Sequence, residues 1–375
     1  MTDIGFVRSE LVPAKPAPNR TSGWVAWAQK NLFATPVDAL LTFLGALFLL
    51  WIVPPLFNFV IGLAVGPFGT VEECRTVGAG ACWAYIYNEM EFFIYGFYDI
   101  PQQWRPNIVF ALGILLFVPL LMPKVPFKRI NAVLFLVVFP VVSYFLLAGG
   151  VFGLSEMPTE KWGGLLVTLI ISVVGITLSF PLGIVLALGR QSSLPVIKTI
   201  CVGFIELIRA VPLITILFMA SIMLPLFMPQ GTSVDKLLRA LVGVTLFTSA
   251  YMAEVVRGGL QAIPRGQYEA GASLGLGYWQ RMYFIILPQA LKHVIPGIVN
   301  NFISLFKDTS LVYIVGMKDL LEAVKTKNDS ALEWQSSNTA TTGYLFAAMV
   351  FWAFCFSMSR YSMFMERRLN TGHKR

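Results

Sequence analysis

Residues 39 to 71 form one apolar stretch that contains no charged side chain. A helix needs about 20 residues, at roughly 1.5 Å of rise each, to cross the hydrocarbon core of a membrane. The stretch starts far from the N-terminus and is longer than the apolar segment of a secretory signal, which has about 7–15 residues. We therefore expect a membrane-spanning helix that the mature protein retains.

Seven further apolar stretches follow, and 56% of the 375 residues are hydrophobic while only 13% are charged. A soluble domain cannot hide that much apolar surface. The sequence therefore predicts an all-α protein, a polytopic transmembrane bundle of about eight helices. The expected spans are 39–71, 107–122, 130–152, 164–189, 202–228, 237–256, 295–317 and 342–359.

The spans suggest four parts of the chain. The N-terminal tail is expected to be mobile, because it has too little apolar content to fold alone. An aromatic-rich outer loop, 66–106, is expected to lie flat on the membrane surface. The parts are a tail (1–37), a three-helix extension with that loop (38–155), a core with a long inner loop at 257–292 (160–362) and a basic tail (363–375).

The positive charges indicate the orientation, because Lys and Arg are retained on the cytoplasmic side. With the N-terminus inside, 18 of the 28 Lys and Arg residues fall in inner segments, eight in outer segments and two within spans. Both termini are therefore predicted to be cytoplasmic. The net charge of +8 is spread over inner loops, so no nucleic-acid partner is needed to explain it.

The predicted topology places Cys74 and Cys82 outside, where the spacing permits a disulfide and two free thiols are the alternative. Cys201 and Cys355 lie in spans and resemble small apolar residues. The cysteines and the two histidines lack the spacing of a metal site, so no metal is expected.

Charged residues inside a membrane are costly and normally meet a partner or line a cavity. Glu206 and Arg209 are three residues apart on one predicted helix, so a structural ion pair between them is expected. Pro212 follows one turn later and predicts a kink.

Lys307 and Asp308 are adjacent, so they point about 100° apart on a helix and do not face each other. One or both must meet another helix, or the helix is interrupted there, in which case Thr309 and Ser310 can satisfy the freed backbone groups. Two interpretations follow: a structural ion pair between helices, or a lining of the substrate path. The candidate path residues are Asn300, Asn301, Ser304, Lys307, Asp308 and Thr309.

The inner loop contains a predicted helix that starts at Pro264. Gly271 and Gly275 are four residues apart, so they are expected to share one helix face and leave a shallow notch. Such a face suits either the docking of another protein or packing of the loop on its own bundle.

Seven residues of this loop resemble the EAA loop of ABC importer permeases, with the pattern Glu-Ala-Ala, three residues, Gly, nine residues, Ile, one residue, Leu-Pro. The matching residues are Glu269, Ala270, Gly271, Gly275, Ile285, Leu287 and Pro288. Gly271 departs from the usual Ala; it lowers helix propensity by up to about 1 kcal/mol but keeps the notch. In that family the loop is a coupling helix that docks into a cleft of the cytosolic ATPase.

The stretches 204–218 and 300–321 resemble the polar amino acid permeases, whose five-helix core begins here near Gly164. The three preceding helices resemble those of general L-amino acid and glutamate/glutamine/aspartate/asparagine uptake systems. The resemblance implies the permease subunit of a periplasmic binding-protein-dependent amino-acid importer in the bacterial inner membrane. Which amino acids are carried, and what the extra helices do, does not follow from it.

The chain has no G-x-x-x-x-G-K-[ST] phosphate loop. The resemblance implies that a dimer of separate ATPase chains binds ATP and Mg, and that this chain is not an enzyme and carries no cofactor. The other implied partners are a periplasmic amino-acid-binding protein, membrane lipid and a second homologous permease. A heterodimer of permeases is expected, with a homodimer as the alternative.

Two other classes of protein remain alternatives to an importer subunit. A secondary amino acid transporter would need paired halves, and no second copy of the loop at Glu269 or of the segment at Lys307 is found in the sequence. A non-transport assembly protein would have no reason to keep charges within a span. Dependence of uptake on ATP and on a second gene product separates the importer from both.

Overall fold

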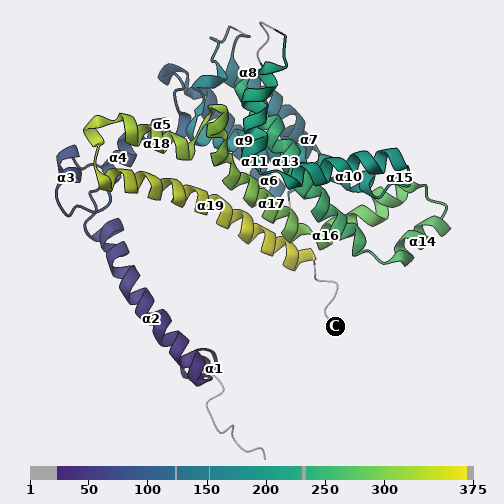
Figure 1. Ribbon diagram of the computed structural model, residues 1–375, viewed down its shortest axis with the longest axis horizontal. Helices are drawn as coiled ribbons and strands as arrows, with labels where there is room; N and C mark the ends of the chain where they lie inside the picture. Colours follow the sequence, from purple (N-terminus) through teal and green to yellow (C-terminus); the bar gives the residue numbers. More distant parts are fainter. Residues whose placement is uncertain (1–22, 123–124, 152, 230–233, 370–375) are drawn as a thin grey trace, which may run out of the picture. The chain divides into compact units, whose positions relative to one another are not determined.

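The computed structural model describes residues 23–122, 125–151, 153–229 and 234–369 (Figure 1). Within those ranges the structure is helical, apart from loops and the two-residue strand β1, Lys318–Asp319. The prediction of an all-α fold is therefore confirmed. Most of the two predicted tails, residues 1–22 and 370–375, lies outside the described residues.

The chain divides into two compact units: residues up to 64 with 78–81, and residues 65–77 with 82 onward. The first unit contains α1 (Trp24–Asn31), α2 (Pro36–Phe57) and the π-helix η1 (Asn58–Gly62). Thr35 caps α2 by accepting a hydrogen bond from the Asp38 backbone N–H at 3.1 Å, and Pro36 occupies the first helical position. None of the residues of α2 is buried, as expected for an apolar helix whose solvent is lipid. The predicted tail 1–37 is thus helical from Trp24.

The second unit holds the remaining helices of the extension and all of the core. The extension comprises α3 (Val71–Arg75), α4 (Trp83–Asn88), α5 (Met90–Tyr95), η2 (Ile100–Gln102), α6 (Trp104–Leu121), α7 (Lys128–Val133), η3 (Leu134–Val138) and α8 (Phe139–Ala148). After the short helix η4 (Thr159–Lys161), the core comprises α9 (Gly164–Arg190), α10 (Pro195–Ala210), α11 (Leu213–Phe218), η5 (Met219–Met223), α12 (Leu224–Leu226), α13 (Lys236–Gln261), α14 (Arg265–Ser273), α15 (Tyr278–Arg281), η6 (Met282–Ile286), α16 (Leu287–His293), α17 (Ile295–Asp308), η7 (Thr309–Val315), α18 (Leu320–Ser330), η8 (Leu332–Trp334) and α19 (Ser337–Leu369).

The described residues contain six helical segments long and apolar enough to span a membrane, and eight if two bent pairs each count as one. The six are Pro36–Gly62, Ile100–Leu121, Lys128–Ala148, Gly164–Arg190, Lys236–Gln261 and Ser337–Leu369. The pairs are Pro195–Ala210 with Leu213–Leu226, bent by 101°, and Tyr278–His293 with Ile295–Val315, bent by 66°. The expected number of about eight agrees with this count.

The predicted span at 202–228 is not a straight helix: it corresponds to the second half of α10 with α11, η5 and α12, and the kink expected near Pro212 is the 101° bend. Val211 is extended, with φ −111° and ψ 135°, because the ring of Pro212 disfavours the α conformation in the residue before it. The chain therefore turns between α10 and α11. The last predicted boundary also differs, since α19 continues as a helix through residues 363–369.

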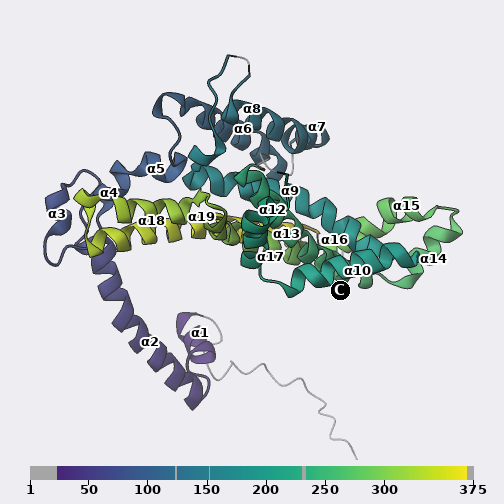
Figure 2. The same cartoon turned by 45° about the horizontal axis from the view of Figure 1, so that its top comes forward.

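Helices α9 and α13 form the centre of the core, and small residues let them approach (Figure 2). A Cβ on Gly183 would lie 2.6 Å from the Cβ of Met252 on α13, and one on Gly175 would lie 3.4 Å from a methyl carbon of Val244 on α13 and 3.1 Å from one of Leu305 on α17. Glycine at these positions therefore allows helix packing closer than any side chain would permit.

The predicted outer loop folds into α3, α4 and α5, which pack on α18, η8 and the first half of α19. Cys82, Tyr85, Phe93, Val324 and Trp334 belong to one buried cluster that joins these elements. The stretch is thus attached to helices of the core, and its predicted position at the membrane surface stays a prediction.

Candidate functional site

The loop with the EAA-like residues is a helical hairpin, formed by α14 as the first arm and by α15 with η6 as the second. The hairpin (residues 265–286) projects from one end of the second unit in both views (Figures 1 and 2). Two hydrogen bonds tie its arms and base together: Arg281 Nη1 donates to the Tyr268 carbonyl at 3.3 Å, and Gln289 Nε2 donates to Gln267 Oε1 at 3.1 Å.

The expectation that Gly271 and Gly275 share one helix face is wrong, because α14 ends before Gly275. The Leu276 N–H donates to the Gly271 carbonyl at 3.2 Å and the Gly275 N–H donates to the Ala272 carbonyl at 2.9 Å. These are the two bonds of a Schellman motif, which needs a left-handed residue, and Gly275 has φ +75°. Gly275 is therefore the turn residue of the hairpin.

The notch at Gly271 is filled by the hairpin itself. Gly271 is buried, and a Cβ there would lie 3.0 Å from Arg281 Cγ and 3.2 Å from Ile285 Cδ1. Glu269 and Ala270 lie on the exposed side of α14. Of the seven EAA-like residues, Gly271, Gly275 and Ile285 shape the hairpin, Leu287 packs against a core cluster, and Glu269, Ala270 and Pro288 are exposed.

The hairpin also exposes large apolar side chains. Leu274, Trp279, Tyr283 and Phe284 have exposed fractions of 76%, 71%, 71% and 67%. Several exposed apolar side chains on one loop are typical of a contact site for a protein or a membrane.

The segment at Lys307 and Asp308 is an interrupted helix, as one of the sequence interpretations required. Helix α17 ends at Asp308 and continues as the 3-10 helix η7. The hydroxyl of Thr309 donates to the Phe306 carbonyl at 2.8 Å, and that of Ser310 donates to the Lys307 carbonyl at 3.0 Å. These two side chains satisfy carbonyls near the break, as predicted.

The described residues contain no ion pair between helices at Lys307 or Asp308, which was the alternative interpretation. None of the eight ion pairs found there involves Lys307 or Asp308. The reason is the orientation of α17, whose apolar face, with Ile298, Leu305 and Phe306, is buried in the bundle. The opposite face carries Asn300, Ser304 and Lys307, whereas Asn301 and Asp308 flank the buried Leu305.

This opposite face forms a polar stripe along α17. Asn300 and Lys307 are exposed, and Asn301, Ser304 and Asp308 are half-buried. Asn300, Ser304 and Lys307 follow one another at intervals of four and three residues, which is the spacing of one helix face. Thr309, the last candidate path residue, is fully buried and serves the backbone.

The predicted ion pair between Glu206 and Arg209 is not formed. Glu206 pairs with Arg190 of α9 at 2.9 Å, and Arg209 lies 3.6 Å from Glu254 of α13. Residues on neighbouring helices therefore replace the local partner, which on one helix surface contributes only about 0.2–0.5 kcal/mol.

Glu254 lies at the centre of a charge cluster that sequence reasoning missed. Its carboxylate accepts hydrogen bonds from Arg190 at 2.8 Å and from Arg257 at 3.0 and 2.8 Å, and its side chain is only 16% exposed. The sequence did contain a signal: Glu254 and Arg257 are three residues apart near the end of a predicted span, which is the spacing of Glu206 and Arg209.

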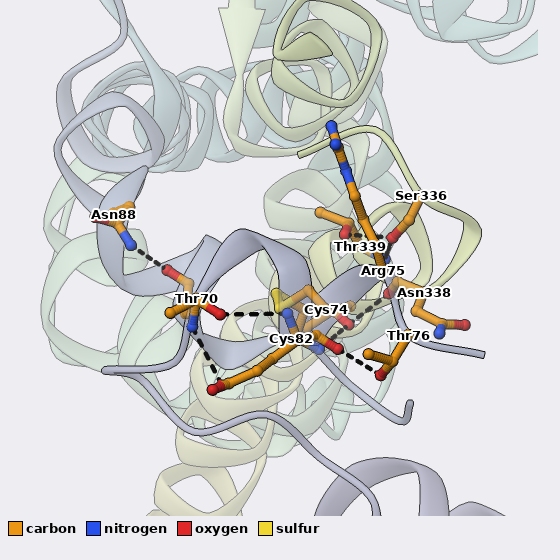
Figure 3. The surroundings of a disulfide bond; sticks show 12 residues. Thr70, Cys74, Arg75, Thr76, Cys82, Asn88, Ser336, Asn338 and Thr339 are labelled. Carbon is orange, nitrogen blue, oxygen red and sulfur yellow. Dashed lines mark hydrogen bonds between the residues drawn. A yellow bond between two sulfur atoms is a disulfide. The ribbon is translucent and has the colours of Figure 1, made fainter. Parts of the chain in front are cut away.

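Cys74 and Cys82 form a disulfide, with both residues buried and their Cα atoms 5.5 Å apart (Figure 3). The Cys82 N–H donates to the Thr342 hydroxyl at 2.9 Å, and Arg75 Nη2 donates to the Leu332 and Glu333 carbonyls at 3.0 and 2.5 Å. The disulfide thus closes the loop that is attached to η8 and α19.

A search of the described ranges finds no group of three His, Cys, Asp or Glu residues that could hold a metal ion. The fold and the site define a polytopic membrane subunit with an exposed hairpin and an interrupted polar helix. Residues 179–371 match the family of binding-protein-dependent transport system inner membrane components. The chain belongs to this family.

Relatives match along the whole chain, including the extension. The inner membrane amino-acid ABC transporter permease protein YhdY of Escherichia coli (strain K12) is 48% identical over 361 residues, which are 96% of this chain and 97% of the relative. The glutamate/glutamine/aspartate/asparagine transport system permease protein BztC of Rhodobacter capsulatus is 39% identical over 440 aligned positions, covering all of both chains. A crystal structure of an amino acid ABC transporter with histidines is 29% identical, with a TM-score of 0.48, over 55% of this chain and 92% of that chain.

Proposed function

We propose that this chain is the permease subunit through which L-amino acids cross the bacterial inner membrane in an ATP-driven importer. Two long relatives, of which the chain covers nearly the whole length, are named as permeases for amino acids. The observation that carries the proposal is the polar stripe on α17, which ends in Lys307 and Asp308 at a break in the helix.

The stripe suits a substrate path better than a surface in contact with lipid. A charged side chain at a helix centre costs about 2.5–3.5 kcal/mol on insertion scales, so Lys307 and Asp308 have to meet water, substrate or another protein. An amino acid carries one ammonium and one carboxylate group. Adjacent residues of opposite charge offer a partner to each of these groups, and Asn300 and Ser304 add hydrogen-bonding groups along the face of Lys307.

A path lined on one side by α17 needs a second wall. We propose that a related but distinct permease supplies it, so that two polar stripes face each other across the path. A homodimer would build the same path from two copies of this chain.

The hairpin is the proposed contact with a dimer of cytosolic ATPase chains, which bind ATP and Mg. Its exposed residues, Glu269 and Ala270 together with the apolar side chains at its tip, are the surface available to such a partner. The outer segment closed by the disulfide suits the oxidising side of the membrane, where a soluble amino-acid-binding protein delivers substrate. This orientation agrees with cytoplasmic termini.

The test is to neutralise both charges of the stripe with Lys307→Gln and Asp308→Asn in the assembled importer. We expect ATP-dependent amino-acid uptake to fall at least tenfold, while the ATPase still co-purifies. The matched control is Glu322→Gln with Lys325→Gln, which removes a pair of opposite charges 3.8 Å apart on α18. Unchanged uptake in the stripe variant would contradict the proposed path, and loss of the ATPase would assign the charges to assembly.

A further inference from the structure

Five charged side chains from three helices meet near the ends of α9, α10 and α13. Glu206 and Arg209 belong to α10, Arg190 ends α9, and Glu254 and Arg257 belong to α13. Arg190 bonds both carboxylates, to Glu206 at 2.9 Å and to Glu254 at 2.8 Å. Two of the contacts, Arg190–Glu206 and Arg209–Glu254, connect α10 to the helices beside it; we call them the clamp pairs.

Helix α10 is held on one side only. Ile205 is fully buried against the core, whereas Val196, Ile200 and Leu207 on the other side have exposed fractions of 68%, 66% and 65%. At its end, the extended Val211 and the ring of Pro212 interrupt the helical hydrogen bonds, and the chain turns by 101°. A helix with one attached face and a break at its end can swing as a unit.

The charges of α10 have a second arrangement available. Glu206 and Arg209 are three residues apart on one helix, so their side chains can reach each other whenever α10 leaves its neighbours. Glu254 would then keep Arg190 at 2.8 Å and the two bonds from Arg257. Each carboxylate therefore has a cationic partner in both arrangements.

We propose that α10 is a hinged arm that is released during the transport cycle, and that the clamp pairs are exchanged for a Glu206–Arg209 pair when it moves. Glu206 is 55% exposed and Arg209 is 34% exposed, and ion pairs with exposed partners contribute little to stability, so the clamp pairs cost little to break. Exchange of partners lowers that cost further, so the two positions of the arm can lie close in free energy. Arg209, at 3.6 Å from Glu254, forms the longest of the contacts and is the first that movement would break.

A cysteine already present in the chain permits a direct test. A Cβ on Gly189, at the end of α9, would lie 3.4 Å from the Cβ of Cys201 on α10 and would overlap its sulfur. The Cβ atoms of disulfides lie about 3.5–4.5 Å apart. The substitution Gly189→Cys therefore places two thiols where oxidation locks α10 onto α9 in the clamped position.

The experiment uses the reconstituted importer with Gly189→Cys and with Cys355→Ala, which removes the other free cysteine. Oxidation is expected to crosslink the chain internally and to reduce ATP-dependent uptake at least tenfold, and a reductant is expected to restore it. Gly189→Ser is the matched control, since it has similar size and forms no crosslink. If the fully crosslinked protein takes up amino acids as fast as the same protein treated with reductant, the proposal is overturned. Failure of the crosslink to form would overturn it too.

A second measurement tests the exchange of partners. The double change Glu206→Arg with Arg209→Glu keeps a pair within α10 but sets like charges against Arg190 and Glu254. In the Gly189→Cys protein it should slow crosslinking at least fivefold, because the arm spends less time clamped. An unchanged crosslinking rate would show that the clamp pairs do not hold the arm.

The inference rests on the proposed transport function, but the two fail differently. If neither the parent importer nor the unoxidised Gly189→Cys importer shows ATP-dependent uptake, the proposed transport function is contradicted. An active parent whose crosslinked form is equally active would contradict only the hinged arm. The crosslinking rate is measured on the protein itself and does not depend on uptake.

Discussion

Gly96 and Gly163 lie backbone against backbone, so that a Cβ on Gly96 would lie 2.7 Å from the nitrogen of Gly163 and would overlap its Cα. Gly96 follows α5 and Gly163 precedes α9, and an isolated antiparallel bridge joins Gly96 to Trp162. The contact therefore fixes the end of the outer segment to the start of the first core helix.

The substitution Gly96→Ala should lower the unfolding temperature of the detergent-purified protein markedly, because it adds a clash to an unfavourable φ of +67°. Gly78→Ala is the control: its φ is +85°, but nothing lies within 4 Å of the added Cβ. The clash at Gly163 is expected to make the shift for Gly96→Ala the larger of the two. Equal shifts would mean that the contact at Gly163 adds nothing to stability.

Removal of the disulfide with Cys74→Ala and Cys82→Ala should destabilise the outer segment by about 2.5 kcal/mol on the loop-entropy model. The loss should appear as faster proteolysis near α3, because Arg75 and Cys82 N–H attach this loop to η8 and α19. Cys201→Ala is the control for the loss of a sulfur atom. Unchanged proteolysis would show that the hydrogen bonds suffice without the crosslink.

Asp319 should make stability depend on pH. It is fully buried at the start of α18, and burial raises the pKa of its carboxyl to about 6, although the backbone N–H groups of Leu321 and Glu322 bond it. The folded protein therefore binds this proton more tightly than the unfolded chain, whose pKa is near 3.8. Protonation of Asp319 therefore stabilises the folded protein. This contribution is complete below pH 3.8 and is lost as the pH rises through about 6.

The substitution Asp319→Asn should remove this slope while keeping the helix cap, since Asn caps helices as well as Asp does. At pH 7 the variant should unfold at a higher temperature than the parent protein, and Asp319→Ala should unfold at a lower one than Asp319→Asn. Thermal unfolding followed between pH 4 and pH 7 checks both. Parallel pH profiles for the parent and Asp319→Asn would contradict the assigned pKa.

A bulky residue on the exposed side of α14 should block the ATPase. Ala270→Trp is expected to leave the protein folded and inserted, while the amount of co-purified ATPase falls at least fivefold. Lys325→Trp on α18 is the control for an exposed tryptophan. Full recovery of the ATPase with Ala270→Trp would contradict docking at the hairpin.

The sequence predicted best what depends on local spacing and on burial in lipid. The apolar stretches, the break at Lys307 and Asp308 and the role of Thr309 and Ser310 all follow from neighbouring residues. The helix expected to start at Pro264 is present as α14, but the expected common face of Gly271 and Gly275 is wrong because the helix does not continue past Leu274. A Gly at φ +75° ends a helix as readily as it leaves a notch in one.

Contacts between distant residues were not predictable in the same way. Glu206 and Arg209 are suitably spaced to pair, but Arg190 and Glu254 compete for them after the helices pack. The bond from Cys82 to Thr342 joins residues 260 positions apart, and a single sequence offers no signal for it. The same holds for the approach of Gly96 to Gly163.

The central claim is tested most directly by reconstituting the chain in liposomes with a second permease, the ATPase and a binding protein, and measuring uptake of labelled L-amino acids. The account predicts uptake that requires both ATP and the binding protein and that stops when the ATPase carries a hydrolysis-blocking substitution. Uptake by this chain alone, driven by an ion gradient without ATP, would contradict it.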